Sequence, residues 1–385
     1  MKTPYLVAAA LALIPSMVYA QPVEEWRTRF AAGEQARQAH DAAAYASEMA
    51  ASARALPSGI LNRPFVQYHA ARAAALAGDA GAAVAWLREA WEEGIESLMI
   101  SFAPYDPAFD AIREDPAFRA VMELPAAMVL SARRLRGTVY LIDGAGSNVL
   151  AQVGPDGVLL VDTGYGPALP ALRAALRSIG AGQVDRLVIT HPHEDHMGSA
   201  PDLGTDALIL AHPRTAEAMR VPYVFMEGVS MPPKPAVALP DVEVAADTTF
   251  RYNGEAVRIV PTAAHTPGDV TVYFPDARVA HFGDTYLPGN PMMFPGQDDP
   301  DAFLDRLDAL LDSMHPETIV VGGHADPADL AAVRAQIEES RACIALVRAA
   351  LADGLTLEET AQRGADRFAP QWIAFFHRSL AGQGG

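Results

Sequence analysis

The run His191-Pro192-His193-Glu194-Asp195-His196 restricts the fold of this chain more than any other feature of its sequence. It places three imidazoles and two carboxylates in six residues, directly after the apolar stretch 187–189 and Thr190. Imidazole nitrogens and carboxylate oxygens are donors that suit zinc, and also iron or manganese. On a loop that leaves a strand, such side chains can converge without helical spacing. The run therefore indicates a metal site at a strand end, in preference to a solvated polar turn.

Three later segments offer further ligands of the same kind. They contain His265 before Thr266-Pro267-Gly268, Asp284 between Gly283 and Thr285, and His324 after Gly323. Each segment follows a short run with β-branched residues, which predicts a position at or just beyond a strand end. Five of the eleven histidines belong to this set, and structural histidines would not repeatedly fall at such junctions. The set predicts one site at one edge of a sheet.

Together these segments resemble the metallo-β-lactamase superfamily. The matching motifs are His-x-His-x-Asp-His at 191–196, His-Thr-Pro-Gly at 265–268, Gly-Asp-Thr at 283–285 and Gly-His at 323–324. The resemblance extends upstream to Leu160-Val161-Asp162-Thr163-Gly164 and covers about residues 130 to 325. It implies an α/β fold of the αββα type, a sandwich with a dinuclear metal site at one edge.

The resemblance also implies a set of seven metal ligands. One metal would be held by His191, His193 and His265, the second by Asp195, His196 and His324, with Asp284 bridging the two. Two cations about 3.5 to 4 Å apart can share a hydroxide, because metal binding lowers the pKa of water from about 15.7 toward ~7. We expect two Zn²⁺ per chain, with iron or manganese possible. Asp195 would also act catalytically by positioning the hydroxide.

Asp162 has two interpretations of equal weight. It is either a carboxylate that fixes the orientation of a ligand imidazole or a strand-end residue that caps the turn at Thr163-Gly164.

The bridging carboxylate narrows the chemistry within the superfamily. The familiar β-lactamase branches have Cys or Ser at the position of Asp284, whereas glyoxalase II-like thioesterases, lactonases and phosphodiesterases keep Asp. The sequence therefore favours a hydrolase that attacks a carbonyl centre in a small ester, thioester, lactone or lactam, with the weight away from lactams. His193 stands where the flavodiiron branch has Glu, which disfavours that redox role. A mononuclear iron oxidoreductase resembling persulfide dioxygenases shares these ligands and is an alternative.

The amino terminus indicates export. Lys2 is followed by an apolar run from Tyr5 to Pro15 and by Val18-Tyr19-Ala20, so residues 1–20 are expected to be a cleavable signal peptide and the protein periplasmic or secreted. The run is shorter than the ~20 residues of a membrane-spanning helix, so no stable membrane anchor is expected. The single Cys343 permits no intrachain disulfide and is expected to be buried.

Charge limits the class of substrate. The formal net charge is −18, and a protein that processes nucleic acids needs a basic surface to meet phosphates. We therefore expect a small-molecule substrate and no nucleic acid.

The chain of 385 residues is long enough for more than one folding unit. Residues 22–127 have helical apolar spacing and predict an all-α domain like a helical repeat, in which one tetratricopeptide-like helix pair turns at Gly78-Asp79. Residues 130–325 would form the hydrolase domain, with strands at 138–142, 148–153 and 158–161, and residues 326–385 a helical extension. The first domain offers a possible surface for a protein partner. A helical-repeat adaptor, with the hydrolase fold as a positioning module, is a further alternative.

Two loops combine proline with large apolar residues, at 221–240 and 286–298. They would form either an apolar wall over the metals or satellite core clusters beneath long loops. Tyr286, in the second loop, is two positions beyond Asp284 and could donate a hydrogen bond to an oxyanion, a role that the sequence does not favour.

Overall fold

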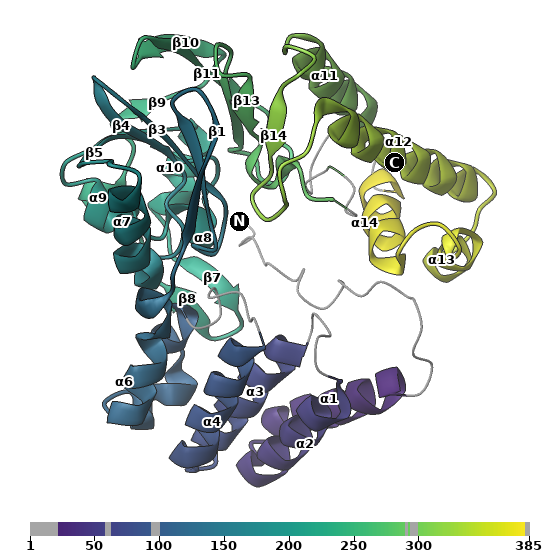
Figure 1. Cartoon of the computed structure of the whole chain (residues 1–385). Coiled ribbons are helices and arrows are strands. Elements are labelled where there is room, and N and C mark those ends of the chain that lie inside the picture. The colour runs from purple at the N-terminus through teal and green to yellow at the C-terminus, as the bar shows by residue number, and fades with distance from the viewer. Residues whose placement is uncertain (1–21, 58–62, 94–100, 289–291, 293–298, 382–385) are drawn as a thin grey trace. The chain divides into compact units, whose positions relative to one another are not determined.

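The computed structural model describes residues 22–57, 63–93, 101–288, 292 and 299–381 (Figure 1). The expected signal peptide lies outside the described residues. The chain divides into two compact units, one with residues up to Met128 together with Pro222–Pro232, the other with Val129–Val221 and Pro233–Gly385. Among the described helices, none combines the length and apolarity that crossing a bilayer requires.

The first unit consists of helices and one hairpin. Its elements are α1 (Pro22–Gln38), α2 (Ala42–Ala55), α3 (Arg63–Leu76), α4 (Ala80–Glu92), the short turns η1 (Ala103–Tyr105) and η2 (Pro107–Ile112), α6 (Pro116–Met122), η3 (Leu124–Ala127), and strands β7 (Tyr223–Met226) and β8 (Val229–Met231). Its N-terminal helices form the all-helical region that the sequence predicts before the hydrolase domain, and the hairpin comes from the later segment 223–231.

Two helix pairs in this unit have the same turn. α3 and α4 are joined through Gly78, at φ +82°, and Asp79 caps α4 by accepting the N–H of Ala82. α1 and α2 are joined through His40, at φ +58°, and Asp41 caps α2 in the same way. The sequence indicated only the pair α3–α4, because Gly is the usual residue at positive φ and a histidine there gives no such signal.

A buried histidine lies in the core of the helical unit. The ring of His69 packs against Phe30 and Phe65, at centroid distances of 5.1 and 4.6 Å. Neither ring nitrogen has a hydrogen-bond partner among the described residues. Burial, with a smaller contribution from Arg72, lowers the pKa of His69 to about 3. The imidazole is therefore neutral at physiological pH and behaves as part of the apolar core.

We expect His69 to make the helical unit sensitive to acid. The unfolded chain takes up a proton at His69 near pH 6.5 and the folded chain only near pH 3, so stability present above pH 6.5 is lost as the pH falls. Each pH unit in that window removes up to about 1.4 kcal/mol. The variant His69→Phe keeps an aromatic ring and removes the titration. In urea unfolding followed by circular dichroism at pH 7 and pH 4.5, it should lose less stability than the unaltered protein. Equal losses would contradict this role.

A buried ion pair also stabilises the helical unit. The guanidinium Nε of Arg72 lies 2.6 Å from Asp106, which is fully buried, and the hydroxyl of Tyr68 donates to the same carboxylate at 3.0 Å. Asp106 also accepts the N–H of Ala108 at the start of η2. These contacts satisfy the buried carboxylate, as burial of a charge requires.

The hairpin β7–β8 belongs to the helical unit. The ring of Phe102 stacks on Phe225 at 4.1 Å and lies 5.6 Å from Tyr223. Val229 and Met231 complete this small apolar cluster. Residues 223–231 thus match the second interpretation of the loop at 221–240, a satellite core cluster.

The second unit is a sandwich of two sheets. The first has the order β1-β2-β3-β4-β5-β6-β9 and the second β10-β11-β12-β13-β14. Their bounds are β1 Ser131–Arg136, β2 Val139–Asp143, β3 Val149–Gly154, β4 Gly157–Val161, β5 Val184–Val188, β6 Leu208–Ala211, β9 Val242–Glu243, β10 Thr248–Tyr252, β11 Glu255–Pro261, β12 Val270–Phe274, β13 Val279–His281 and β14 Ile319–Val321. Alternate apolar residues of both sheets form the core between them, among them Leu159, Val161, Ile259 and Val272.

Helices lie beside both sheets (Figure 1). They are α7 (Leu169–Ser178), α8 (Glu194–Met197), α9 (Ala200–Leu203), α10 (Pro213–Met219), α11 (Pro300–Asp312), α12 (Leu330–Ala352), α13 (Leu357–Gly364) and α14 (Pro370–Ala381), with short turns η4 (Gly166–Ala168), η5 (Ala236–Ala238) and η6 (Gly283–Thr285). The helices α11, α12 and α14 share a core with the second sheet, in which Cys343 is buried. The αββα sandwich predicted from the sequence is confirmed.

Candidate metal centre

The centre is built on two parallel neighbouring strands. β4 ends at Val161 and β5 at Val188, and the two pair in parallel, so Asp162 and His191 leave the same edge of the sheet. The short helix α8 starts after His193 and brings Asp195 and His196 back toward this edge. The spacing of the motif thus reflects the local structure. His191 follows the strand end, His193 is extended, and one helical turn carries Asp195 and His196.

One group of side chains contains His191, His193 and His265. The Nδ1 atom of His193 lies 3.0 Å from Nε2 of His191 and 3.0 Å from Nε2 of His265. Residues 191 and 193 come from the loop after β5, and His265 from the loop that joins β11 to β12. These three nitrogen atoms and an oxygen of Asp284 lie within 4.8 Å of one another, a spacing at which they could hold a metal ion.

The other group contains Asp195, His196 and His324. The Oδ2 atom of Asp195 lies 3.0 Å from Nε2 of His324 and 3.4 Å from Nε2 of His196. His324 comes from the loop after β14. This second group also satisfies the spacing of a metal site.

Asp284 lies between the two groups. Its Oδ2 is 3.8 Å from Nε2 of His191 and 3.6 Å from Nε2 of His265. Its Oδ1 is 3.3 Å from Nε2 of His196 and 3.5 Å from Nε2 of His324. One carboxylate therefore presents one oxygen to each group. All seven residues named from the sequence meet here, in the two groups that the family resemblance implied.

Asp162 orients the second group. Its Oδ2 is 2.7 Å from Nδ1 of His196, so Nε2 of that ring points toward Asp195 and Asp284. The same carboxylate accepts the backbone N–H and the hydroxyl of Thr190. Asp162 lies at φ +64°, a conformation that Asp adopts more readily than most residues. Of its two interpretations, the structure agrees with the orientation of a ligand imidazole.

Two residues to which the sequence interpretation gave no role hold the other ligand loops. Asp269 accepts the backbone N–H groups of Ala264, His265 and Thr266, and so fixes the loop that carries His265. Asn148 donates to the carbonyl oxygens of Gly322 and Ala325, both at 2.8 Å, on either side of His324. Both are polar residues beside the family motifs, and only their contacts show what they do.

Burial and neighbouring charges shift the pKa values of the histidines in the centre, and two of these histidines are left neutral and able to bind a cation at pH 7. Loss of hydration, reinforced by His265, lowers the pKa of His193 to about 3, and burial likewise lowers the pKa of His191. Both rings are neutral at pH 7 and offer a lone pair. For His196 burial acts in the same direction, but Asp195, Asp284 and Asp162 outweigh it and raise the pKa. The carboxylates thus attract positive charge to this edge of the sheet.

The residues present fit metal ions. Among the described residues, neither Oδ1 of Asp284 nor Nε2 of His196 has a hydrogen-bond partner, although both are buried. Gly323 permits their approach, because a Cβ at that position would lie 2.0 Å from Oδ1 of Asp284. Five imidazoles and two carboxylates form a donor set that suits zinc, iron or manganese.

Two residues of the proline-containing loop at 286–298, Tyr286 and Met292, lie in an apolar core cluster of the second unit. Tyr286 is 4% exposed and belongs to the same apolar cluster as Phe303 and Leu330. Burial, with Asp329 nearby, raises the pKa of its hydroxyl. Met292 is buried in that cluster, and the rest of 289–298 lies outside the described residues. The structure therefore gives Tyr286 a packing role.

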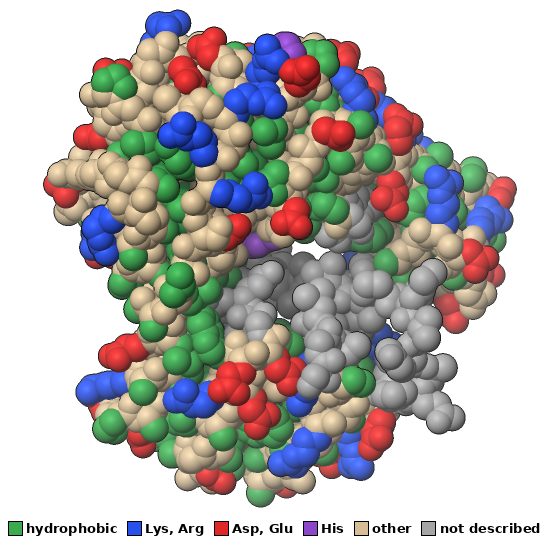
Figure 2. Space-filling view, viewed as in Figure 1, with side chains coloured by type: hydrophobic (Ala, Val, Ile, Leu, Met, Phe, Trp, Pro, Cys, Tyr) green, Lys and Arg blue, Asp and Glu red, His purple; other side chains and the backbone are tan. Residues whose placement is uncertain are grey.

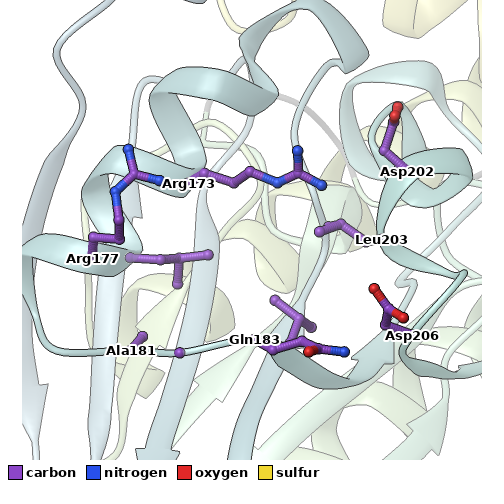
Figure 3. A pocket seen from close by; sticks show the side chains of 10 residues that line it. Arg173, Arg177, Ala181, Gln183, Asp202, Leu203 and Asp206 are labelled. Carbon is purple, nitrogen blue, oxygen red and sulfur yellow. The ribbon is translucent and has the colours of Figure 1, made fainter.

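The pocket of Figure 3 is separate from the centre. It is lined by Arg173 and Arg177 of α7, by the segment 181–184, and by Asp202, Leu203 and Asp206. None of the seven predicted ligands lines it.

On the described part of the face seen in Figure 2, basic side chains are scattered among acidic ones and form no continuous band.

Comparison with known proteins agrees with this geometry. The sequence model described as "Metallo-beta-lactamase superfamily" matches residues 137–324. A hydroxyacylglutathione hydrolase of Acidiphilium cryptum (strain JF-5) is 32% identical over 185 residues, which are 47% of this chain and 68% of that protein. The alpha subunit of a 2,4-dinitroanisole O-demethylase from Nocardioides sp. (strain JS1661) is 31% identical over 42% of this chain and 47% of its own length.

Solved structures agree at the level of the fold. The stereoselective inverting sec-alkylsulfatase Pisa1 from Pseudomonas sp. superimposes with a TM-score of 0.50 at 18% identity, over 65% of this chain and 50% of that one. With this likeness in fold, the family match over the whole centre and a relative of 32% identity, the chain belongs to the metallo-beta-lactamase superfamily.

Proposed function

We propose that this metallo-hydrolase binds two divalent metal ions, with zinc the expected metal, and cleaves an ester-type bond at a carbonyl centre. The observation that carries the proposal is the place of Asp284, whose two oxygens face different ligand groups. A carboxylate in that position suits a bridge between two cations. The first cation would be held by His191, His193 and His265, and the second by Asp195, His196 and His324.

The chain's own residues prepare this chemistry. When bound, a pair of divalent cations supplies a water of lowered pKa and a Lewis acid for the substrate carbonyl. His191 and His193 are neutral at pH 7 and need to lose no proton before they bind. Asp162 fixes the ring of His196 through Nδ1 and leaves Nε2 for a ligand. In this proposal Asp195, a member of the second group, also orients the attacking water.

The hydroxyacylglutathione hydrolases among the relatives support an acyl substrate. A hydroxyacylglutathione hydrolase, by its name, releases an acyl group from a thiol, and Asp at position 284 agrees with such ester-type hydrolysis. The sequence shows no evident match to the glutathione-binding extension of glyoxalase II. We therefore propose the general class of small esters, thioesters and lactones, with lactams as weaker substrates.

A hydrolysis screen tests this function. Zinc-loaded protein is offered an aryl ester, an acyl thioester, a lactone and a β-lactam, and product formation is followed by absorbance or pH. We expect turnover of at least one of the first three to exceed that of the lactam. A single iron per chain with oxygen consumption, and no hydrolysis, would show the mononuclear oxidoreductase instead.

A further inference from the structure

Lys234 is exceptional in the composition of this chain. Of the 29 Lys and Arg residues, only Lys2 and Lys234 are lysines. Lys2 lies in the expected signal peptide, so Lys234 would be the one lysine of the mature protein. Its position between Pro233 and Pro235 gave no motif, and the sequence interpretation assigned it no role. The scarcity of lysine was the signal that could have drawn attention to it.

Lys234 is buried beside the metal-binding motif. Its side chain is 8% exposed, and its Nζ lies 2.6 Å from Oε2 of Glu194, whose side chain is 3% exposed. A buried ammonium persists in a protein when it is paired.

Glu194 occupies the position that links the two ligand groups. It stands between His193, which belongs to the first group, and Asp195, which belongs to the second. It is also the first residue of α8, the short helix that returns His196 to the centre. A shift of the backbone at Glu194 would therefore displace a ligand of each group.

Lys234 is itself held within the same unit. Its backbone N–H donates to the carbonyl of Met219, at the end of α10, at 2.8 Å. The same helix contacts the other ligand loop, because the hydroxyl of Thr215 donates to the carbonyl of Gly268 at 2.8 Å. Lys234 thus joins the end of α10 to the turn that carries His193 and Asp195.

We propose that Lys234 is a positioning residue of the metal centre, which holds the turn from His193 to His196 through its ion pair with Glu194. The inference rests on the proposed function, since it concerns the binding of metal by this turn. It differs from the role of Asp269, which holds the loop of His265 alone. Loss of Lys234 should weaken both metal sites, whereas loss of Asp269 should weaken the first.

The test measures Zn²⁺ affinity by competition with a chromophoric chelator, and the absorption bands of the Co²⁺-loaded protein. Lys234→Met should lower the affinity of both sites on the order of 10- to 100-fold, the usual effect of a residue that supports a metal ligand, and alter the Co²⁺ bands. Lys234→Arg keeps the charge and should recover most of the affinity. The double variant Lys234→Met/Glu194→Gln leaves no unpaired buried charge, so it should regain stability while its Zn²⁺ affinity stays low.

Arg72→Met is the matched control. It removes the cation of the buried pair with Asp106 in the helical unit, so it should lower the melting temperature and leave Zn²⁺ affinity unchanged. If the folded double variant binds Zn²⁺ as tightly as the unaltered protein, Lys234 is not a positioning residue. If the unaltered protein itself binds no divalent metal, it is the proposed function that fails.

Discussion

Replacement of Asp284 by Asn is expected to lower turnover on the order of 10³-fold or more. The amide has nearly the shape of the carboxylate but no charge and only one oxygen, so it cannot face both ligand groups as Oδ1 and Oδ2 do. Both metals should therefore bind more weakly. The measurement is kcat/KM on the best substrate of the hydrolysis screen, with the metal content of the same sample.

Asp247→Asn provides the control. Asp247 pairs with Arg258 on the surface of the same unit, and its loss should leave turnover unchanged. If Asp284→Asn retained the activity of this control, Asp284 would not be a bridging ligand, and the assignment of two metals would fall with it.

The variants His193→Ala and Asp195→Ala are each expected to abolish measurable hydrolysis, a loss also on the order of 10³-fold or more. His193 belongs to one ligand group and Asp195 to the other, so each variant should keep about one metal per chain and lose the other. Kinetics with metal analysis of the folded variants separates the two losses. The helical unit contains neither residue and should keep its unfolding transition.

A histidine outside the centre serves as the comparison. His212 caps α10 by accepting the N–H of Arg214 through its Nδ1, and His212→Ala should cost stability but not turnover. Full activity in either His193→Ala or Asp195→Ala would show that the site has been assigned wrongly.

The sequence predicted the residues of the metal centre more completely than the strands and contacts around it. Ligands such as His191 and His265 lie at strand ends, and a strand end is visible as an apolar run that stops at Gly, Pro or polar residues. Helix α12 (Leu330–Ala352) and the capping box at Thr356 and Glu359 rest on similarly local features of the sequence. Local signals of this kind need no knowledge of distant contacts.

The features that the sequence did not show depend on distant partners. The stacking of Phe225 on Phe102 joins residues more than a hundred positions apart, so no periodicity indicates that the hairpin packs in the helical unit. Strand β1, which was not predicted, is an edge strand with three arginines and much exposed surface, and it lacks the apolar alternation of a buried strand. The role of Lys234 likewise exists only through Glu194, forty positions away.

Export and partner binding stay predictions. The signal peptide at 1–20 and a partner surface on the helical unit are expected from the sequence. Each would decide where the hydrolase acts and would leave its metal centre unchanged. Neither is needed for the chemistry proposed here.

The most direct test of the account is the metal content of the purified protein, measured by inductively coupled plasma mass spectrometry after reconstitution with Zn²⁺ and removal of unbound metal. We predict about two zinc ions per chain, and a clear reduction in Asp284→Asn. A protein that retains no metal, or one iron in place of two zinc ions, would contradict the account.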